Sequence, residues 1–208
     1  MSKIKYFVEQ SWLLIASSFC FGLLIAVTSA ALLPKIEENK ATKLNELTMA
    51  LLREAKEFIK VEEEIEVELS GGKKERAKVY KALSEAGECV GWSFNASGQG
   101  FADKIELVIA VDSRFEKIAG FNVLASSETP GFGDQIKSSY YRGQFIGAPA
   151  EKLNLIKSGD TKKIDSEIVS ITGATVSSEA VIQIINTYLL QIKEQAKEKG
   201  LIADGKGK

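Results

Sequence analysis

The residues of this chain that could do chemistry lie in two short segments rich in glycine and hydroxyl side chains. The first is Ser126–Asp134 (SSETPGFGD), where two glycines and a proline follow a predicted strand and restrict the backbone closely. Glycines let the backbone approach a flat ligand, and Glu128 and Thr129 could hydrogen-bond the edge of such a ligand. The alternative is an ordinary turn that ends in a helix cap, and this segment alone does not decide between the two.

The second segment is Ser170–Ser178 (SITGATVSS), directly before the last predicted helix. Ser177 or Ser178 is expected to cap that helix. The small residues around Thr175 leave its hydroxyl accessible, and a phosphate there would lie beside free amides at the positive end of the helix dipole. The segment is not a Walker P-loop, because no GK[ST] follows. Taken by its residues alone, it is also compatible with a plain helix cap.

The composition restricts what else the chain can do. Its 208 residues carry 27 Lys+Arg and 28 Asp+Glu, so the net charge of −1 gives no electrostatic reason to expect a nucleic-acid partner. There is no histidine, and the cysteines are Cys20 and Cys89. Ordinary zinc sites, Ser-His-Asp and Cys-His hydrolases, four-thiolate clusters and CxxC pairs are therefore excluded. We expect no metal site and no catalytic side chain, so any redox chemistry must come from a bound organic cofactor.

An uncharged segment near the N-terminus predicts a membrane anchor. Trp12 to Leu33 is almost entirely apolar or small, and at a rise of about 1.5 Å per residue it forms a helix long enough to cross the hydrocarbon layer. Pro34 is expected to end this helix. A cleaved signal peptide or a buried core helix are the alternatives, but the run is longer than a usual signal-peptide core. Lysines on both sides leave the orientation undecided by count, and the short basic N-terminus favours a cytoplasmic N-terminus with the domain exported.

The remainder predicts one domain of the α+β class, with an antiparallel sheet and packed helices. Short turns containing glycine or serine separate the predicted strands, which favours antiparallel pairing over parallel crossovers. We divide the chain into a cytoplasmic tail and transmembrane anchor (1–34), a connecting helix (35–60), a folded domain (61–200) and a flexible tail (201–208). Helices are predicted over 37–60 and 178–199, and strands over 65–69, 78–83, 88–94, 104–112 and 117–125.

Both segments, in this order and behind an anchor, resemble the FMN-binding subunit of the membrane Rnf and Nqr complexes, the RnfG/NqrC family. The resemblance runs nearly end to end and rests on the joint occurrence of ETPGFGD at 128–134 and TGATVS at 172–177. It implies an FMN-binding domain in which FMN is attached to Thr175 by a phosphoester. It also implies further cofactor-binding residues, at the phosphate end Thr172, Gly173, Ala174 and Ser177, and near the flavin ring Glu128, Thr129, Gly131 and Gly133.

The resemblance also implies partners. The protein would be a redox subunit of an Rnf-type complex in the inner (plasma) membrane, single-pass, with its FMN domain on the extracytoplasmic side. It would work with other membrane and peripheral subunits, reaching ferredoxin and NAD only through them, and would be matured by a flavin transferase. Val169 stands where the family often has an acid within the transferase recognition sequence.

The short length and the ETPGFGD motif favour Rnf over Nqr. Three alternatives stay open: an NqrC-like subunit of a Na+-translocating NADH:quinone reductase, an anchored flavoprotein serving another reductase, and a non-redox anchored binding or assembly domain.

Overall fold

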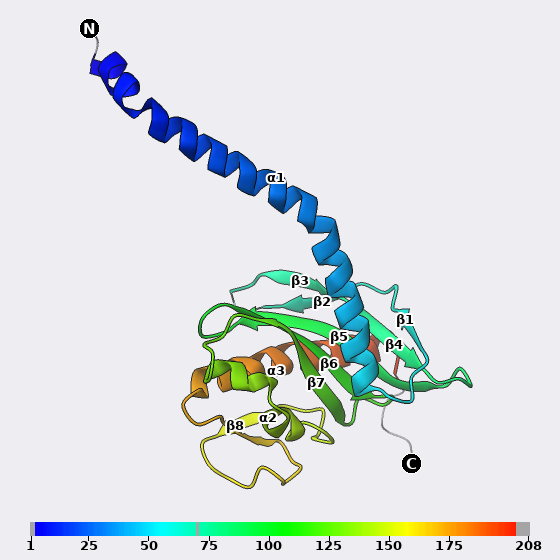
Figure 1. Cartoon of the computed structure of the whole chain (residues 1–208). Coiled ribbons are helices and arrows are strands. Elements are labelled where there is room, and N and C mark those ends of the chain that lie inside the picture. The colour runs from blue at the N-terminus through cyan, green and yellow to red at the C-terminus, as the bar shows by residue number, and fades with distance from the viewer. Residues whose placement is uncertain (1–2, 70, 203–208) are drawn as a thin grey trace, which may run out of the picture. The chain divides into compact units, whose positions relative to one another are not determined.

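The computed structural model describes residues 3–69 and 71–202, and its contacts divide the chain into two units, one up to Lys43 and one from Leu44. The first helix, α1, runs from Lys3 to Leu51, and Pro34 lies inside it (Figure 1). The prediction that Pro34 ends the helix is therefore wrong. A proline removes one helical hydrogen bond, and good helix formers on both sides continue the helix through it.

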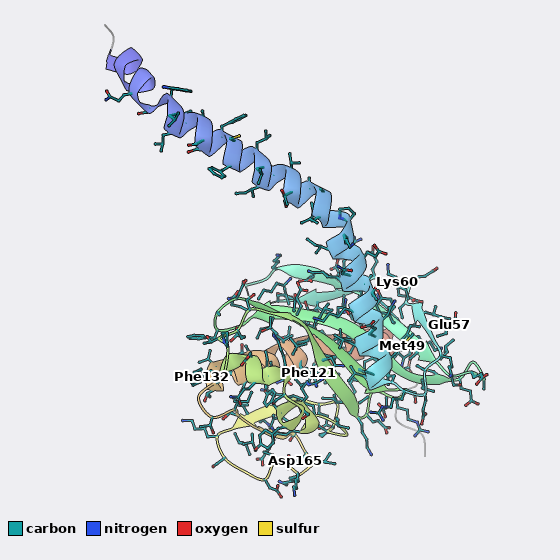
Figure 2. All side chains as sticks on the ribbon, in the orientation of Figure 1. Met49, Glu57, Lys60, Phe121, Phe132 and Asp165 are labelled. Carbon is teal, nitrogen blue, oxygen red and sulfur yellow. The ribbon has the colours of Figure 1, made fainter. Side chains whose placement is uncertain are left out.

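The large apolar side chains between residues 12 and 36 of the first unit are exposed. Trp12, Phe19 and Leu24 have 60%, 72% and 64% of their surface exposed, and the side chains of residues 10–36 project on every side of the helix (Figure 2). α1 contains the one segment, within 3–69 and 71–202, that is long and apolar enough to cross a membrane. Continuous apolar surface of this extent on a helix suits an apolar medium rather than water.

The second unit is built on a five-stranded antiparallel sheet in the order β1-β4-β5-β6-β7. This confirms the predicted combination of helices with an antiparallel sheet. Four of its strands coincide with predicted ones, and β5 extends five residues further than expected. The bounds are β1 Glu57–Lys60, β4 Val79–Leu83, β5 Cys89–Gln99, β6 Lys104–Asp112 and β7 Ile118–Ser126.

Strand β1, the one strand of the sheet that was not predicted, shows that the prediction of a helix over 37–60 is wrong at its C-terminal end. The helix ends at Leu51, and β1 pairs with β4 so that Phe58 lies opposite Ala82. Phe58 follows the helical spacing of the preceding leucines, but its ring packs in a small apolar cluster on the sheet. Pairing with the sheet edge therefore overrides the local periodicity.

Two helical segments cover the two faces of this sheet (Figure 1). The last helix, α3 (Thr175–Glu198), packs on the main core, where Leu107, Ile109 and Val111 of β6 face it. The last turns of α1 lie on the opposite face, where Asn122 Nδ2 donates to the Leu47 carbonyl at 3.0 Å.

Shorter elements complete the unit. Strands β2 (Ile65–Glu68) and β3 (Lys74–Ala77) form a hairpin through Gly71 and Gly72, both at positive φ. The sequence predicted β2, within the strand expected over 65–69, and did not predict β3. Unpredicted elements are the 3-10 helix η1 (Gly133–Lys137), helix α2 (Ser139–Gly143) and the parallel pair β8 (Asn154–Ile156) and β9 (Glu167–Val169).

The predicted flexible tail lies mostly outside the described residues. It included Leu201 and Ile202, yet Ile202 is buried in the main core. The rest of that prediction, residues 203–208, falls in the part of the chain for which no structure is described.

Candidate functional site

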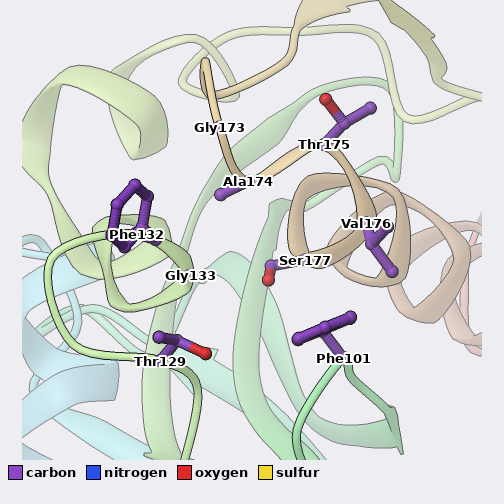
Figure 3. Close-up of a pocket in the computed structure, with 9 residues that line it drawn as sticks. All are labelled: Phe101, Thr129, Phe132, Gly133, Gly173, Ala174, Thr175, Val176 and Ser177. Carbon is purple, nitrogen blue, oxygen red and sulfur yellow. The ribbon is translucent and has the colours of Figure 1, made fainter.

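The two segments singled out in the sequence meet at one cavity. Its volume is about 440 Å³, within the range of small-molecule and cofactor sites. Sheet register brings the walls together: Ile105 of β6 pairs with Ser126 of β7, so the loops before β6 and after β7 leave the same end of the sheet. Figure 3 shows the residues that line the cavity: Phe101, Thr129, Phe132, Gly133, Gly173, Ala174, Thr175, Val176 and Ser177.

The wall that carries Thr175 is a tight turn leading into α3. Gly173 has φ of +81°, a conformation that favours glycine, and Ala174 is the N-cap with no side-chain capping bond. The prediction that Ser177 or Ser178 caps the helix is wrong, because α3 begins at Thr175 and both serines lie inside its first turn. Ser178 Oγ instead accepts from the Ile171 amide and donates to the Ala174 carbonyl, both at 3.0 Å.

The start of α3 offers hydrogen-bond donors to an anion. The amide of Ser178 bonds the Ala174 carbonyl at 3.0 Å, the first bond of the helical pattern. The amides of the preceding residues in the first turn have no partner within the helix, and the helix dipole is positive at this end. No acidic side chain lies in that turn, and the Thr175 side chain is exposed. A phosphate bound at Thr175 would therefore meet amides and no carboxylate of that first turn.

Apolar side chains also line the cavity. Phe101 and Phe132 are 65% and 57% exposed, and they come from separate loops (Figure 3). Val176, 54% exposed, adds a third apolar side chain from α3. Large apolar side chains exposed around a cavity, next to a set of polar donors, are typical of sites for ligands with an apolar and a polar end.

Glu128 has a different place from the one its segment suggested. Its side chain is 5% exposed and does not line the cavity. Oε1 accepts from the Ala102 amide at 3.0 Å, and Oε2 accepts from Ser177 Oγ at 2.5 Å. Both carboxylate oxygens are therefore used within the protein, one side chain away from the cavity.

A buried tyrosine supports the first turn of α3 from behind. The Tyr141 hydroxyl donates to the Ser178 carbonyl at 3.2 Å, and its ring is fully buried. Burial raises the pKa of this phenol well above its usual range, more than the Ser178 contact lowers it. Tyr141 therefore stays a neutral donor at physiological pH.

The structure thus brings most of the predicted site residues together. Six of them line the cavity, in two groups from the two segments: Thr129 and Gly133, and Gly173, Ala174, Thr175 and Ser177. Thr172, Gly131 and Glu128 do not line it. The sequence analysis did not predict Phe101, Phe132 and Val176 as lining residues. The two phenylalanines could have been found, because each is an aromatic residue within a glycine-containing loop, whereas no comparable feature marks Val176.

The cavity lies within the part of the chain that matches a known family. Residues 100–190, which contain every residue that lines the cavity, match the family of FMN-binding domains. This part of the chain is similar to FMN-binding domains.

Two relatives are named as the G component of an ion-translocating complex. Identity is 32% over 116 residues with the G component of the ion-translocating oxidoreductase complex of Methanosarcina acetivorans, covering 56% of this chain and 58% of that one. Identity is 26% over 174 residues with the G component of the proton-translocating ferredoxin:NAD(+) oxidoreductase complex of Clostridium ljungdahlii, covering 84% and 85%. The chain thus matches less than two thirds of the first relative's length and most of the second's.

Two solved structures share the fold. NqrC of Shewanella oneidensis has a TM-score of 0.56 and 21% identity over 70% of this chain and 73% of its own. The corresponding C component of the Na(+)-translocating NADH-quinone reductase of Parabacteroides distasonis has a TM-score of 0.53 and 18% identity over 75% and 94%. Together with the G-component relatives, these structures confirm the resemblance to the RnfG/NqrC family.

The cavity fits the shape and chemistry of FMN. A flavin mononucleotide joins a flat, largely apolar ring system to a phosphate through a polar chain. The cavity has exposed Phe101 and Phe132 as apolar walls and the first turn of α3 as an anion site. Glycine at position 173 leaves room for the Phe132 ring beside the start of α3, since a Cβ at this position would lie 3.3 Å from that ring.

Proposed function

We propose that this protein is an electron-transfer subunit of an Rnf-type ion-translocating ferredoxin:NAD oxidoreductase complex, with FMN attached to Thr175 by a phosphoester. One observation carries the proposal: an exposed threonine hydroxyl at a helix N-terminus shares a cavity with two exposed aromatic rings. The G-component relatives support membership of such a complex. We choose Rnf over Nqr because of these relatives, since the similarity to the solved NqrC structures concerns the fold alone.

Thr175 is the residue that would carry the cofactor. Its Oγ1 would form the bond to the phosphorus of FMN, and the P–O bond that joins this phosphorus to the second phosphate of a flavin dinucleotide would break. The second phosphate would leave as a nucleoside monophosphate with the electron pair of that bond, and the hydroxyl proton would pass to it or to a base of the transferase that catalyses the transfer. Amides of the first turn of α3 would stabilise the phosphate charge, and the small neighbours Gly173 and Ala174 would leave the hydroxyl open to the transferase.

The ring end of the cofactor would lie against the aromatic walls. Phe101, Phe132 and Val176 would cover apolar ring surface, and the Thr129 hydroxyl would hydrogen-bond a polar edge. FMN supplies the redox states, while the protein fixes the ring's position and its surroundings. No side chain of the cavity is an acid or a base, so we propose a carrier that is not catalytically complete alone.

The membrane arrangement is part of the proposal. α1 would anchor the chain as a single span of the plasma membrane, with the FMN-binding domain on the extracytoplasmic side and other subunits binding ferredoxin and NAD. Ser139→Cys, on exposed α2 in a Cys89→Ala background, tests the side. We expect a membrane-impermeant maleimide to label it in intact cells or spheroplasts. Labelling only after lysis would place the domain in the cytoplasm.

The attachment is tested by flavin fluorescence of the denatured protein. Wild type, Thr175→Ala and Thr172→Ala are produced with the transferase, denatured and separated on a gel. We expect fluorescent bands for wild type and Thr172→Ala and a dark band for Thr175→Ala. Thr172 is the matched control because its hydroxyl is exposed in the same turn but outside the cavity. A dark wild-type band would refute covalent attachment, and a dark Thr172→Ala band with a fluorescent Thr175→Ala band would move it to Thr172.

A further inference from the structure

Glu128 is a buried carboxylate that joins three segments far apart in the sequence. It follows β7, it receives the amide of Ala102 from the loop before β6, and it receives the hydroxyl of Ser177 from the first turn of α3. Within residues 3–69 and 71–202, the charge of Glu128 forms no ion pair with a basic side chain. A buried carboxylate without a cation depends on such donors for its stability.

Glycines make room for this carboxylate on two sides. A Cβ on Gly133 would lie 2.7 Å from Ser177 Oγ and 2.8 Å from Glu128 Oε2. A Cβ on Gly100 would overlap Glu128 Oε1. Neither glycine has a positive φ, so the backbone conformation does not demand glycine at these positions. Both glycines therefore leave space for the carboxylate, and Gly100 also leaves space for the Asp103 carbonyl and the Ile105 side chain.

Ser177 also has the arrangement of a serine beside a base, which is how nucleophilic hydroxyls are activated. Its side chain is only 3% exposed, whereas Thr175 is exposed two residues earlier. Since the Ser177 proton is donated to Glu128, the contact holds the first turn of the helix. The reachable hydroxyl of this turn is that of Thr175.

We infer that Glu128 is a positioning residue for flavin attachment: through Ser177 it fixes the first turn of α3, and thereby the Thr175 hydroxyl and the adjacent amides. The inference rests on the proposed attachment at Thr175. Holding a nucleophile in the orientation that the reaction needs contributes much of the rate enhancement of a catalysed reaction, and a small misplacement of the nucleophile slows the reaction strongly. The contact with the Ala102 amide also ties the loop that carries Phe101 to Glu128. We call the two hydrogen bonds of Glu128, to Ala102 and to Ser177, the clasp.

Two substitutions separate the hydrogen bonds from the charge. Glu128→Ala removes both contacts. Glu128→Gln removes the charge, yet its amide oxygen can still accept from Ala102 and its amide nitrogen can donate to Ser177 Oγ. Ser177→Ala removes one contact from the other side. Glu85→Ala and Ser139→Ala, both at exposed residues that do not line the cavity, are the matched controls.

The first measurement needs no flavin. Hydrogen exchange is followed on the unmodified full chain in detergent. We expect Glu128→Ala to speed exchange by about tenfold or more at the Ala102 amide and in peptides covering the first turn of α3, because the opening of that turn is no longer opposed by the clasp. Glu128→Gln and the controls should exchange as wild type does. Unchanged exchange in Glu128→Ala would overturn the clasp.

The second measurement is the initial rate of flavin attachment by the transferase. We expect Glu128→Ala and Ser177→Ala to be slower by about tenfold or more, and Glu128→Gln to stay within about threefold of wild type. A Glu128→Ala protein that accepts flavin at the wild-type rate would overturn the inference. A Glu128→Gln protein as slow as Glu128→Ala would show that the effect depends on the charge, and would overturn the positioning role. If Glu128→Ala does not fold, Ser177→Ala decides, since a normal rate there overturns the inference. Failure of wild type to accept flavin would instead refute the proposed function, leaving the exchange result valid.

Discussion

Ser178 is predicted to hold the turn before α3 in place. Its side chain is fully buried, its Oγ accepts from the Ile171 amide at 3.0 Å, and it donates to the Ala174 carbonyl at 3.0 Å. Ser178→Ala leaves the Ile171 amide buried without an acceptor, which costs about 2 kcal/mol of unfolding free energy. For a folded unit of this size that loss corresponds to a decrease in Tm of about 4–8 °C.

The assay is thermal unfolding of the full chain in detergent, followed by circular dichroism, with Ser139→Ala as the control. Ser139 is exposed, so its substitution should leave Tm within about 1 °C of wild type. A Ser178→Ala protein with the wild-type Tm would refute the reasoning. It would show that the Ile171 amide finds another acceptor and that the turn does not depend on Ser178.

Three further predictions follow from the same structure. Because burial raises the pKa of Tyr141, the contribution of this residue to the free energy of unfolding is full below pH 10 and falls above it by up to about 1.4 kcal/mol per pH unit. Denaturant unfolding at pH 9–11.5 should therefore show a shallower fall of stability for Tyr141→Phe than for wild type, and equal slopes would contradict this. Phe132→Ala should make the attached flavin more accessible to iodide quenching, and unchanged quenching would show that the ring does not lie there. Leu23→Arg costs about 3 kcal/mol at the centre of a membrane helix, so fractionation should find less protein in membranes; full retention would argue against a span.

Local pattern was sufficient for the sheet and insufficient for the segment before it. The strand at 104–112 was predicted with its observed bounds, because its apolar residues are continuous and turn residues flank it. Phe58 was assigned to a helix, since its spacing from the leucines of α1 suits one. The partner that makes it a strand, β4, lies more than twenty residues later, and local spacing carries no information about that pairing.

The candidate site shows the same limit. Thr175 and Gly173 could be placed from one short motif because the turn and the helix start are local. Phe101 could not, since it reaches the cavity only through the register that sets Ile105 opposite Ser126. Glu128 was expected at the ligand, but the donors that bury its carboxylate, Ala102 and Ser177, come from two distant segments.

The central claim is the phosphoester on Thr175, and mass spectrometry of the chain isolated from its native membrane tests it most directly. We expect an intact mass raised by one FMN less one water. Trypsin should give the peptide 164–193, which contains both candidate threonines, and fragmentation should locate the added mass on Thr175. An intact mass equal to that of the unmodified polypeptide, or a flavin located on another residue, would contradict the account.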